Sequence, residues 1–142
     1  MKKLSLCIIL IFLTTIVLAK SVTFNRTFFI KLLRNNAINK EKILFNLKNK
    51  LIICSGIITS LKSNYRYGKS YRVVLVDKAA KRFNLKLIYH LYINNTEIFK
   101  KLKKDMKYNI TGQVITVTPV NSSRTEFIID MLFQKGVIII DK

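Results

Sequence analysis

The stretch SNYRYGKSYR, residues 63–72, places three tyrosines and three cations within ten residues. Tyrosine rings can stack on nucleobases, each contact being worth about 1–3 kcal/mol, and cationic side chains can contact phosphates. The same composition is also typical of a solvated hairpin loop in a basic protein. Both interpretations stay open until the surrounding fold is considered.

Further residues suited to the same chemistry lie outside this stretch. Tyr92 adds another ring for stacking, Lys86 and Arg124 add cations, and His90 lies between them on an expected strand. Tyr71 alternates with apolar residues and is assigned to the core. The complete set of candidate ligand-binding residues is Tyr65, Arg66, Tyr67, Lys69, Arg72, Lys86, His90, Tyr92 and Arg124.

Residues suited to catalysis are sparse. His90 is the single histidine, and the seven acidic residues are scattered along the chain. Metal-ligand spacing of Cys and His, a glycine-rich phosphate loop and a G-x-S-x-G motif are all absent from the sequence. General acid–base chemistry by His90 with a carboxylate such as Asp77 or Asp130 is formally open. The sequence favours a protein that is not an enzyme and uses no metal or cofactor.

The net charge is strongly positive. The chain has 26 Lys and Arg against 7 Asp and Glu, a net charge of +19 at pH 7. Such a field attracts polyanions, including nucleic acid and anionic lipid. Ile, Lys and Asn, all encoded by AT-rich codons, make up 53 of the 142 residues, so codon bias is an alternative origin of the charge.

The first residues have the pattern of a secretory signal peptide. A basic MKK start precedes an apolar run over residues 4–19 that ends in VLA, a suitable cleavage site. The run is short for a membrane span, which needs about 20 residues. We expect cleavage after Ala19 and export to the bacterial periplasm or the medium; a membrane anchor formed by residues 4–19 is the alternative. Cleavage leaves Cys54 as the single cysteine, which predicts a buried, inert thiol.

Apolar periodicity predicts the elements of the remaining chain. Helical spacing predicts a lead-in over 27–48, which Asn35-Asn36 could divide into two short helices. Alternating patterns predict strands at 50–62, 71–78, 81–92, 108–118 and 125–134, with a tail strand at 137–140. Residues 63–70 are expected to be a loop. A helix is predicted over 95–106, where one apolar stripe is formed by Ile98, Phe99, Leu102 and Met106.

Five strands with a helix between the third and the fourth is the element order of an OB-fold. We therefore predict a mainly β protein in which a signal peptide (1–19) and a helical lead-in (20–49) precede a five-stranded OB-fold barrel (50–142). Gly56 suits a first strand that curls to serve both sides of the barrel, and helix 95–106 would plug one end. An unrelated sandwich is the alternative. OB-fold ligands lie across strands two and three, between the 63–72 stretch and the Pro119–Arg124 loop.

The lead-in and the first strand also carry a family resemblance. Asn39, Ile43, Leu47 and Lys50 have the spacing of a motif that precedes strand one, and Gly56 follows within that strand. In this pattern the chain resembles the exported OB-fold domains called tRNA-anti-like, over residues 30–135. Ile43 replaces a small residue of that motif and Leu47 replaces an aromatic one. The resemblance implies an OB-fold and an exported address, and it brings no catalytic motif.

Together these patterns predict an exported, non-catalytic OB-fold binding module, expected to be a monomer. Its partner would be anionic: a polymer, an oligonucleotide or an acidic protein surface, although an exported protein rarely meets nucleic acid. The rival hypothesis is an envelope structural or assembly protein that binds through the lead-in helix or the 137–140 edge. Membrane attachment is expected only through an uncleaved signal, because the lysine-rich helix 95–106 is assigned to the barrel plug.

Overall fold

The computed structural model describes residues 21–134 and 139–140. The expected signal peptide lies outside these residues, as do Val137 and Ile138 of the expected tail strand, so these expectations stay predictions. Helices in the described part are α2 (Arg26–Leu33), α3 (Ala37–Phe45), α4 (Lys78–Lys81) and α5 (Thr96–Lys101). Strands in the described part are β1 (Val22–Thr23), β2 (Leu51–Arg66), β3 (Lys69–Val76), β4 (Lys86–Ile93), β5 (Lys107–Pro119), β6 (Glu126–Phe133) and β7 (Ile139–Ile140).

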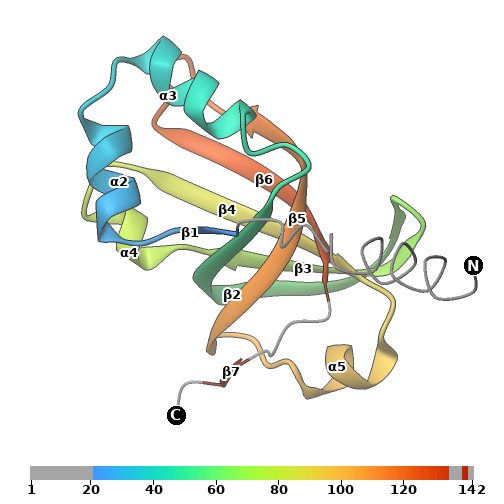
Figure 1. Cartoon of the computed structure of the whole chain (residues 1–142). Helices are drawn as coiled ribbons and strands as arrows, with labels where there is room; N and C mark the ends of the chain where they lie inside the picture. The colour runs from blue at the N-terminus through green and yellow to red at the C-terminus, as the bar shows by residue number, and fades with distance from the viewer. Residues whose placement is uncertain (1–20, 135–138, 141–142) are drawn as a thin grey trace, which may run out of the picture.

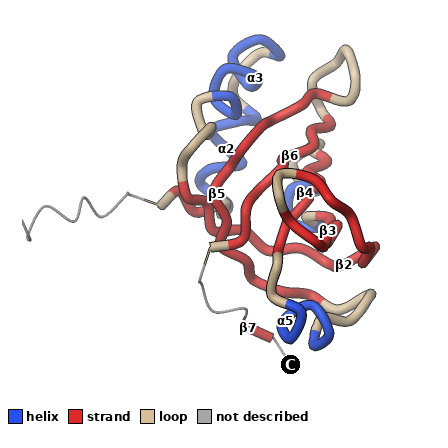
Figure 2. Tube along the Cα trace, turned by 90° about the vertical axis from the view of Figure 1, so that its right-hand side faces the viewer, coloured by secondary structure: helices blue, strands red, loops and turns tan. Residues whose placement is uncertain are grey.

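These strands belong to one sheet in the order β1-β2-β3-β4-β6-β5-β7 (Figure 1). β2 pairs with β3 along one part of its length and with β5 along the other. The pairings of β2, β3, β4, β6 and β5 therefore form a ring, and Figure 2 shows these strands curving around a common interior. The predicted mainly β class with a helical lead-in is confirmed.

Gly56 lies where β2 changes partners. The next residue, Ile57, is paired with both Val76 of β3 and Lys107 of β5. A Cβ atom on Gly56 would lie 2.8 Å from the Cβ of Leu75, well inside the normal separation of packed carbon atoms. The glycine therefore permits the close approach of two strands, and the expectation of a first strand that serves two neighbours is confirmed.

The interior of the ring is the hydrophobic core. Alternate residues of each strand point inward, and Leu87, Tyr89 and Leu91 of β4 are all buried. α2 and α3 cover one end of the ring, where Phe29 and Leu44 are buried (Figure 1). The core is thus built from period-two strands and closed by the apolar faces of short helices.

The lead-in consists of two short helices. Asn25 and Asn36 cap α2 and α3, each accepting a hydrogen bond on its side-chain oxygen from the backbone N–H three residues later. A cap at Asn36 starts a new helix, which is why the 27–48 segment divides at Asn35-Asn36, the division that the sequence left open.

Residues 81–85 are not a strand, contrary to the sequence prediction. Asp77 accepts hydrogen bonds from the backbone N–H groups of Ala79 and Ala80, which starts α4, and β4 begins only at Lys86. The predicted helix over 95–106 is also shorter, because α5 ends at Lys101. Leu102 is buried at the ring, whereas Met106 is exposed and does not belong to an apolar plug.

Candidate functional site

The 63–72 stretch forms the end of the β2–β3 hairpin. Residues 63–66 belong to β2 and Lys69 begins β3, so the expected eight-residue loop is in fact a two-residue turn at Tyr67 and Gly68. Both turn residues have left-handed backbone, with φ of 55° and 68°. Such turns favour Asn-Gly or Asp-Gly, and left-handed backbone costs a tyrosine about 1–2 kcal/mol. Contacts of the Tyr67 side chain offset this cost.

The side chain of Tyr67 folds back over the outer face of the sheet. Its hydroxyl donates a 2.8 Å hydrogen bond to Oδ2 of Asp130 in β6. Nδ1 of His90 in β4 lies 3.0 Å from Oδ1 of the same carboxylate. The Arg66 guanidinium approaches Oδ2 at 3.7 Å. Asp130, a buried carboxylate, thus joins the hairpin tip to β4 and β6.

Strand register explains this meeting of side chains. The parallel pairing of β4 with β6 sets His90 opposite Asp130. An irregularity in the β5–β6 pairing, between Val114 and Thr116, sets Thr116 opposite Asp130 on the other side. The carboxylate therefore lies in the middle of a three-strand row on the outer face.

The protonation states of the central pair suit their hydrogen bond. Burial disfavours an ionised Asp130, but the hydrogen bonds from His90 and Tyr67 and the charges of His90 and Arg66 outweigh it and lower the pKa of the carboxyl below its ordinary value. Burial and the adjacent Asp130 raise the pKa of the Tyr67 phenol. At neutral pH the phenol is thus a neutral donor and the carboxylate an ionised acceptor.

Tyr92 is fully buried, not exposed on the ligand face as the sequence predicted. The Tyr67 ring covers it edge to face, with ring centroids 4.9 Å apart and planes at 85°. Within the described residues, the Tyr92 hydroxyl has no hydrogen-bond partner, and neither has Nε of Arg72, the cross-strand neighbour of Tyr92. Arg66 lies over the Tyr67 ring, 4.9 Å from its centre. Tyr92 can therefore meet a ligand only if Tyr67 moves.

The freely accessible candidates lie at the hairpin tip. The Tyr65 side chain is 91% exposed, the most exposed of the large apolar residues described. The Arg66 side chain is 55% exposed beside it, and Lys69 is half-buried at the start of β3. The tip thus offers solvent a ring and a partly exposed guanidinium, with a half-buried lysine at the start of the next strand.

Lys86 and Arg124 do not join the tip residues. Lys86 lies four residues before His90, about 13 Å away along the strand, and its Nζ pairs with Glu126 at 2.7 Å. Arg124 Nε pairs with Glu41 of α3 at 2.6 Å. Because both charges have acidic partners, the nine candidate residues do not form one continuous cationic groove.

Asp130 is the central residue that the sequence did not include among the ligand-binding candidates. The sequence identified it only as one of two carboxylates that could partner His90. The other, Asp77, instead accepts a 2.7 Å hydrogen bond from the buried Tyr89 hydroxyl and caps α4. The alternation of residues in β6 places Asp130 on the outer face of the sheet. Before the pairing of β4 with β6 was known, this alternation was the only sequence feature that could have marked Asp130 as a site residue.

Cys54 is buried in the core, as expected. Burial, together with the negative charge of Asp77, raises the pKa of its thiol well above the ordinary value, although a hydrogen bond with Tyr89 acts in the opposite direction. A thiol in this environment is protonated at neutral pH and a poor nucleophile.

Other features of the described residues lie away from the tip. A pocket of about 490 Å³ opens beside α2 and α4, lined by Phe24, Asn25, Arg26, Phe29, Ala79, Arg82 and Phe83. No group of three His, Cys, Asp or Glu side chains within residues 21–134 and 139–140 could hold a metal ion. Among the helices described, none is long and apolar enough to cross a membrane.

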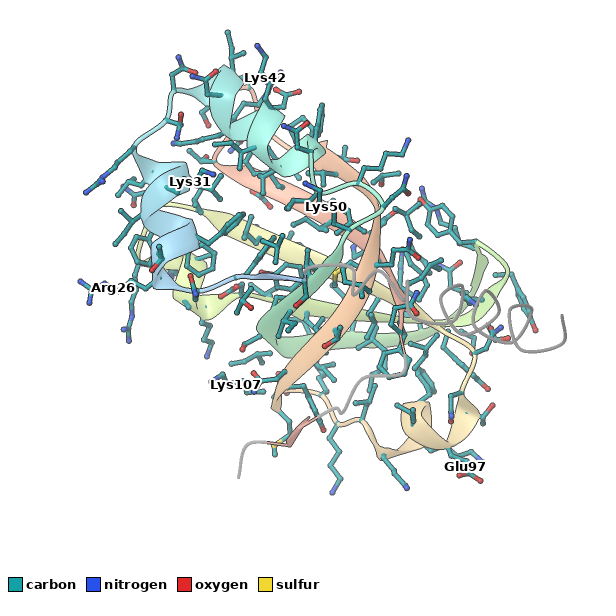
Figure 3. The ribbon with its side chains drawn as sticks, viewed as in Figure 1. Arg26, Lys31, Lys42, Lys50, Glu97 and Lys107 are labelled. Carbon is teal, nitrogen blue, oxygen red and sulfur yellow. The ribbon has the colours of Figure 1, made fainter. Side chains whose placement is uncertain are left out.

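Basic side chains are distributed widely over the molecule. Figure 3 labels Arg26 and Lys31 on α2, Lys42 on α3, Lys50 before β2 and Lys107 at the start of β5. The hairpin tip is therefore distinguished by its exposed ring among cations rather than by its charge alone.

Comparison with known proteins gives distant structural likenesses. No family model matches the chain, and no curated protein matches it either. A solved structure described as a "putative nucleic acid-binding lipoprotein" from Klebsiella pneumoniae aligns with a TM-score of 0.49 and 17% identity, over 82% of this chain and 91% of that one. An OBody bound to hen egg-white lysozyme aligns with a TM-score of 0.38 and 19% identity, over 68% and 87% of the two chains.

A third solved structure, described as a "putative aspartyl-tRNA synthetase" from Leishmania major, aligns with a TM-score of 0.41 and 13% identity. The alignment covers 83% of this chain but only 20% of that protein. At these levels of similarity the comparisons assign the chain to no family, and the resemblance to tRNA-anti-like domains stays a prediction.

Proposed function

We propose that this chain is an exported, non-catalytic OB-fold binding module that binds an anionic polymer with the tip of its β2–β3 hairpin. The observation that carries the proposal is the 91% exposed ring of Tyr65 beside the cations Arg66 and Lys69. An exposed ring flanked by cations combines stacking with phosphate or sulfate contacts, the two interactions by which proteins hold single-stranded polyanions.

The ring of strands supports the OB-fold part of the proposal. α5 lies between the third and fourth strands of the ring, β4 and β5, and β2 pairs with two neighbours. The β2–β3 hairpin is then the connection between strands one and two, and the outer face of β3 and β4 is the face on which OB-folds bind their ligands.

The positive charge supports an anionic partner. After the expected cleavage at Ala19, the chain keeps 24 basic and 7 acidic residues, a net charge of +17. Charge alone would attract polyanions to the whole surface and would weaken with salt. The proposal is more specific, because it assigns the main contact to the tip.

A charge-matched pair of variants tests this assignment. Arg66→Ala with Lys69→Ala removes two cations from the tip, whereas Lys31→Ala with Lys42→Ala removes two exposed cations from α2 and α3. The tip variant should bind labelled single-stranded oligonucleotide or polyphosphate about ten-fold more weakly, and the control variant about two-fold. Equal weakening in both variants would show that binding is spread over the surface.

A second candidate function follows from the lead-in helices. Leu33, Ile38 and Phe45 of the α2–α3 segment are 46%, 67% and 44% exposed. Exposed apolar side chains on neighbouring helices suit a protein–protein contact, as an envelope assembly protein would need. This candidate predicts an oligomer or a bound protein that persists in high salt and is lost on Ile38→Lys with Phe45→Lys. A strict monomer with no salt-resistant partner would rule it out.

A further inference from the structure

The hairpin tip covers a polar site on the outer face of the sheet. Below Tyr67 lie the Asp130 carboxylate, held by His90, and the buried ring of Tyr92. In the described part of the chain, Arg72 Nε of this site is buried without a hydrogen-bond partner, and the buried Tyr92 hydroxyl lies near the Arg66 guanidinium without a hydrogen bond of good geometry. Buried polar groups are nearly always hydrogen-bonded, so these atoms indicate a site that is incomplete in its covered state.

Tyr67 occupies this site as a ligand would. Its ring packs at right angles to that of Tyr92, and its hydroxyl donates to Asp130 Oδ2. The Arg66 guanidinium lies over the face of the Tyr67 ring. A nucleobase has the same three properties: a flat ring, an N–H donor on its edge and a face that accepts a guanidinium. A sugar or a phosphate has no aromatic ring, so neither could make the ring contacts of Tyr67.

The local backbone allows the cover to be removed. The pairing of β2 with β3 is irregular between Ser63 and Arg66, immediately before the turn. Beyond the turn, Ser70 is fixed by a 2.8 Å hydrogen bond from its backbone N–H to the Asn94 side chain. Asn94 also donates a 3.3 Å hydrogen bond to the Gly68 carbonyl, so the displacement is a movement of the Tyr67 side chain and its own backbone beside a turn that stays held.

We infer that Tyr67 is an internal substitute for a base of a single-stranded nucleic acid, and that a bound strand displaces it from Tyr92 and Asp130. The inference rests on the proposed function, because the strand first reaches the tip through Tyr65 and its neighbouring cations. It adds two statements to that function: the bound polymer carries bases, and Tyr67 occupies the base-binding site when no polymer is bound.

The experiment compares two probes of equal charge on the full chain. One is a labelled single-stranded oligodeoxynucleotide, and the other is an abasic oligodeoxynucleotide of the same length. Tyr67→Phe removes the hydroxyl that holds the cover, so its affinity for the base-carrying probe should rise about five-fold, with no change for the abasic probe. Tyr71→Phe, which removes a hydroxyl that contacts Thr96 rather than Asp130, is the matched control and should change neither affinity.

The outcomes separate this inference from the proposed function. If the parent binds neither probe, the proposed function fails. If the parent binds both probes equally and Tyr67→Phe alters neither affinity, polyanion binding stands and the base site is wrong.

A measurement on the parent protein covers the case in which Tyr67→Phe does not fold. In hydroxyl-radical footprinting, oligonucleotide binding should increase the oxidation of Tyr67, which leaves its site, and decrease that of Tyr65, which becomes covered. Protection of both tyrosines would overturn the displacement.

Discussion

Arg124, in the loop between β5 and β6, lies 2.6 Å from Glu41 of α3, measured from Nε to Oε2, and this ion pair ties the lead-in helices to the sheet. The pair also explains why Arg124 takes no part in the tip site. Both side chains are partly buried, so solvent screening is incomplete.

Glu41→Gln should lower the free energy of unfolding by about 0.5–1 kcal/mol, because a partly exposed ion pair contributes no more than this. The loss should shrink when the salt concentration is raised, since salt screens the lost attraction. Urea denaturation at low and high salt measures both effects. A loss that is the same at every salt concentration would mean that packing, not charge, links the two residues.

The ionisation of Asp130 predicts a pH dependence of stability. Because the folded protein holds the pKa of this carboxyl below its ordinary value of about 3.9, the ionised group stabilises the fold above that pH. This contribution is lost as the pH falls through the lowered folded pKa. The stability advantage of the parent over Asp130→Asn should therefore be constant from pH 5 to 7 and shrink below about pH 4. Denaturation curves across this range give the answer; a pH-independent difference would contradict an ionised Asp130.

The buried hydroxyl of Tyr89 predicts a larger stability effect than an exposed one. Tyr89→Phe leaves Oδ2 of the buried Asp77 without its 2.7 Å hydrogen bond, which should cost about 1–3 kcal/mol. Tyr71→Phe removes a hydroxyl that contacts Thr96 at an exposed position and should cost less than about 0.5 kcal/mol. Thermal denaturation of both variants provides the comparison, and equal costs would argue against a tightly coupled Asp77–Tyr89 pair.

Two glycines predict effects of different origin. Gly56→Ala forces a Cβ to within 2.8 Å of Leu75 Cβ, so the strands must separate at a cost of about 1–3 kcal/mol. Gly68→Ala meets no atom within 4 Å, and its cost of about 1 kcal/mol comes from the left-handed backbone alone. A Gly68 variant less stable than the Gly56 variant would mean that the close approach at Leu75 relaxes easily.

Much of the fold was predictable because its signals are local. Period-two alternation marks the ring strands, and the change to helical spacing marks the lead-in and α5. Gly56 signalled the curl of β2 because a missing side chain within a long strand permits close approach. By contrast, the sequence did not predict α4. Asp77 can cap a helix and the two alanines after it favour one, but the alternation of Phe83 and Leu85 predicted a strand that began at residue 81.

The candidate site was only partly predictable, because its decisive contacts join distant residues. Tyr65 and Arg66 were identified from composition, and the structure places both at an accessible tip. The burial of Tyr92 depends on Tyr67, which lies 25 residues earlier in the chain. The environment of Tyr67 depends in turn on Asp130, which lies 63 residues after Tyr67. Local alternation assigns Tyr92 to the outer face, but it cannot show that another segment covers that face.

The closure of the ring also governs when this protein can fold. Leu51–Ile57 of β2 pair with residues 107–113, and β4 pairs with β6 forty residues further along the chain. Pairings this far apart in sequence make folding slow, on the order of milliseconds to seconds. During synthesis the segment up to α5 can form only the β2–β3–β4 meander with β1 beside it. The meander therefore cannot close into the ring until residues 107–133, which hold the remaining partners of β2 and β4, have been synthesised.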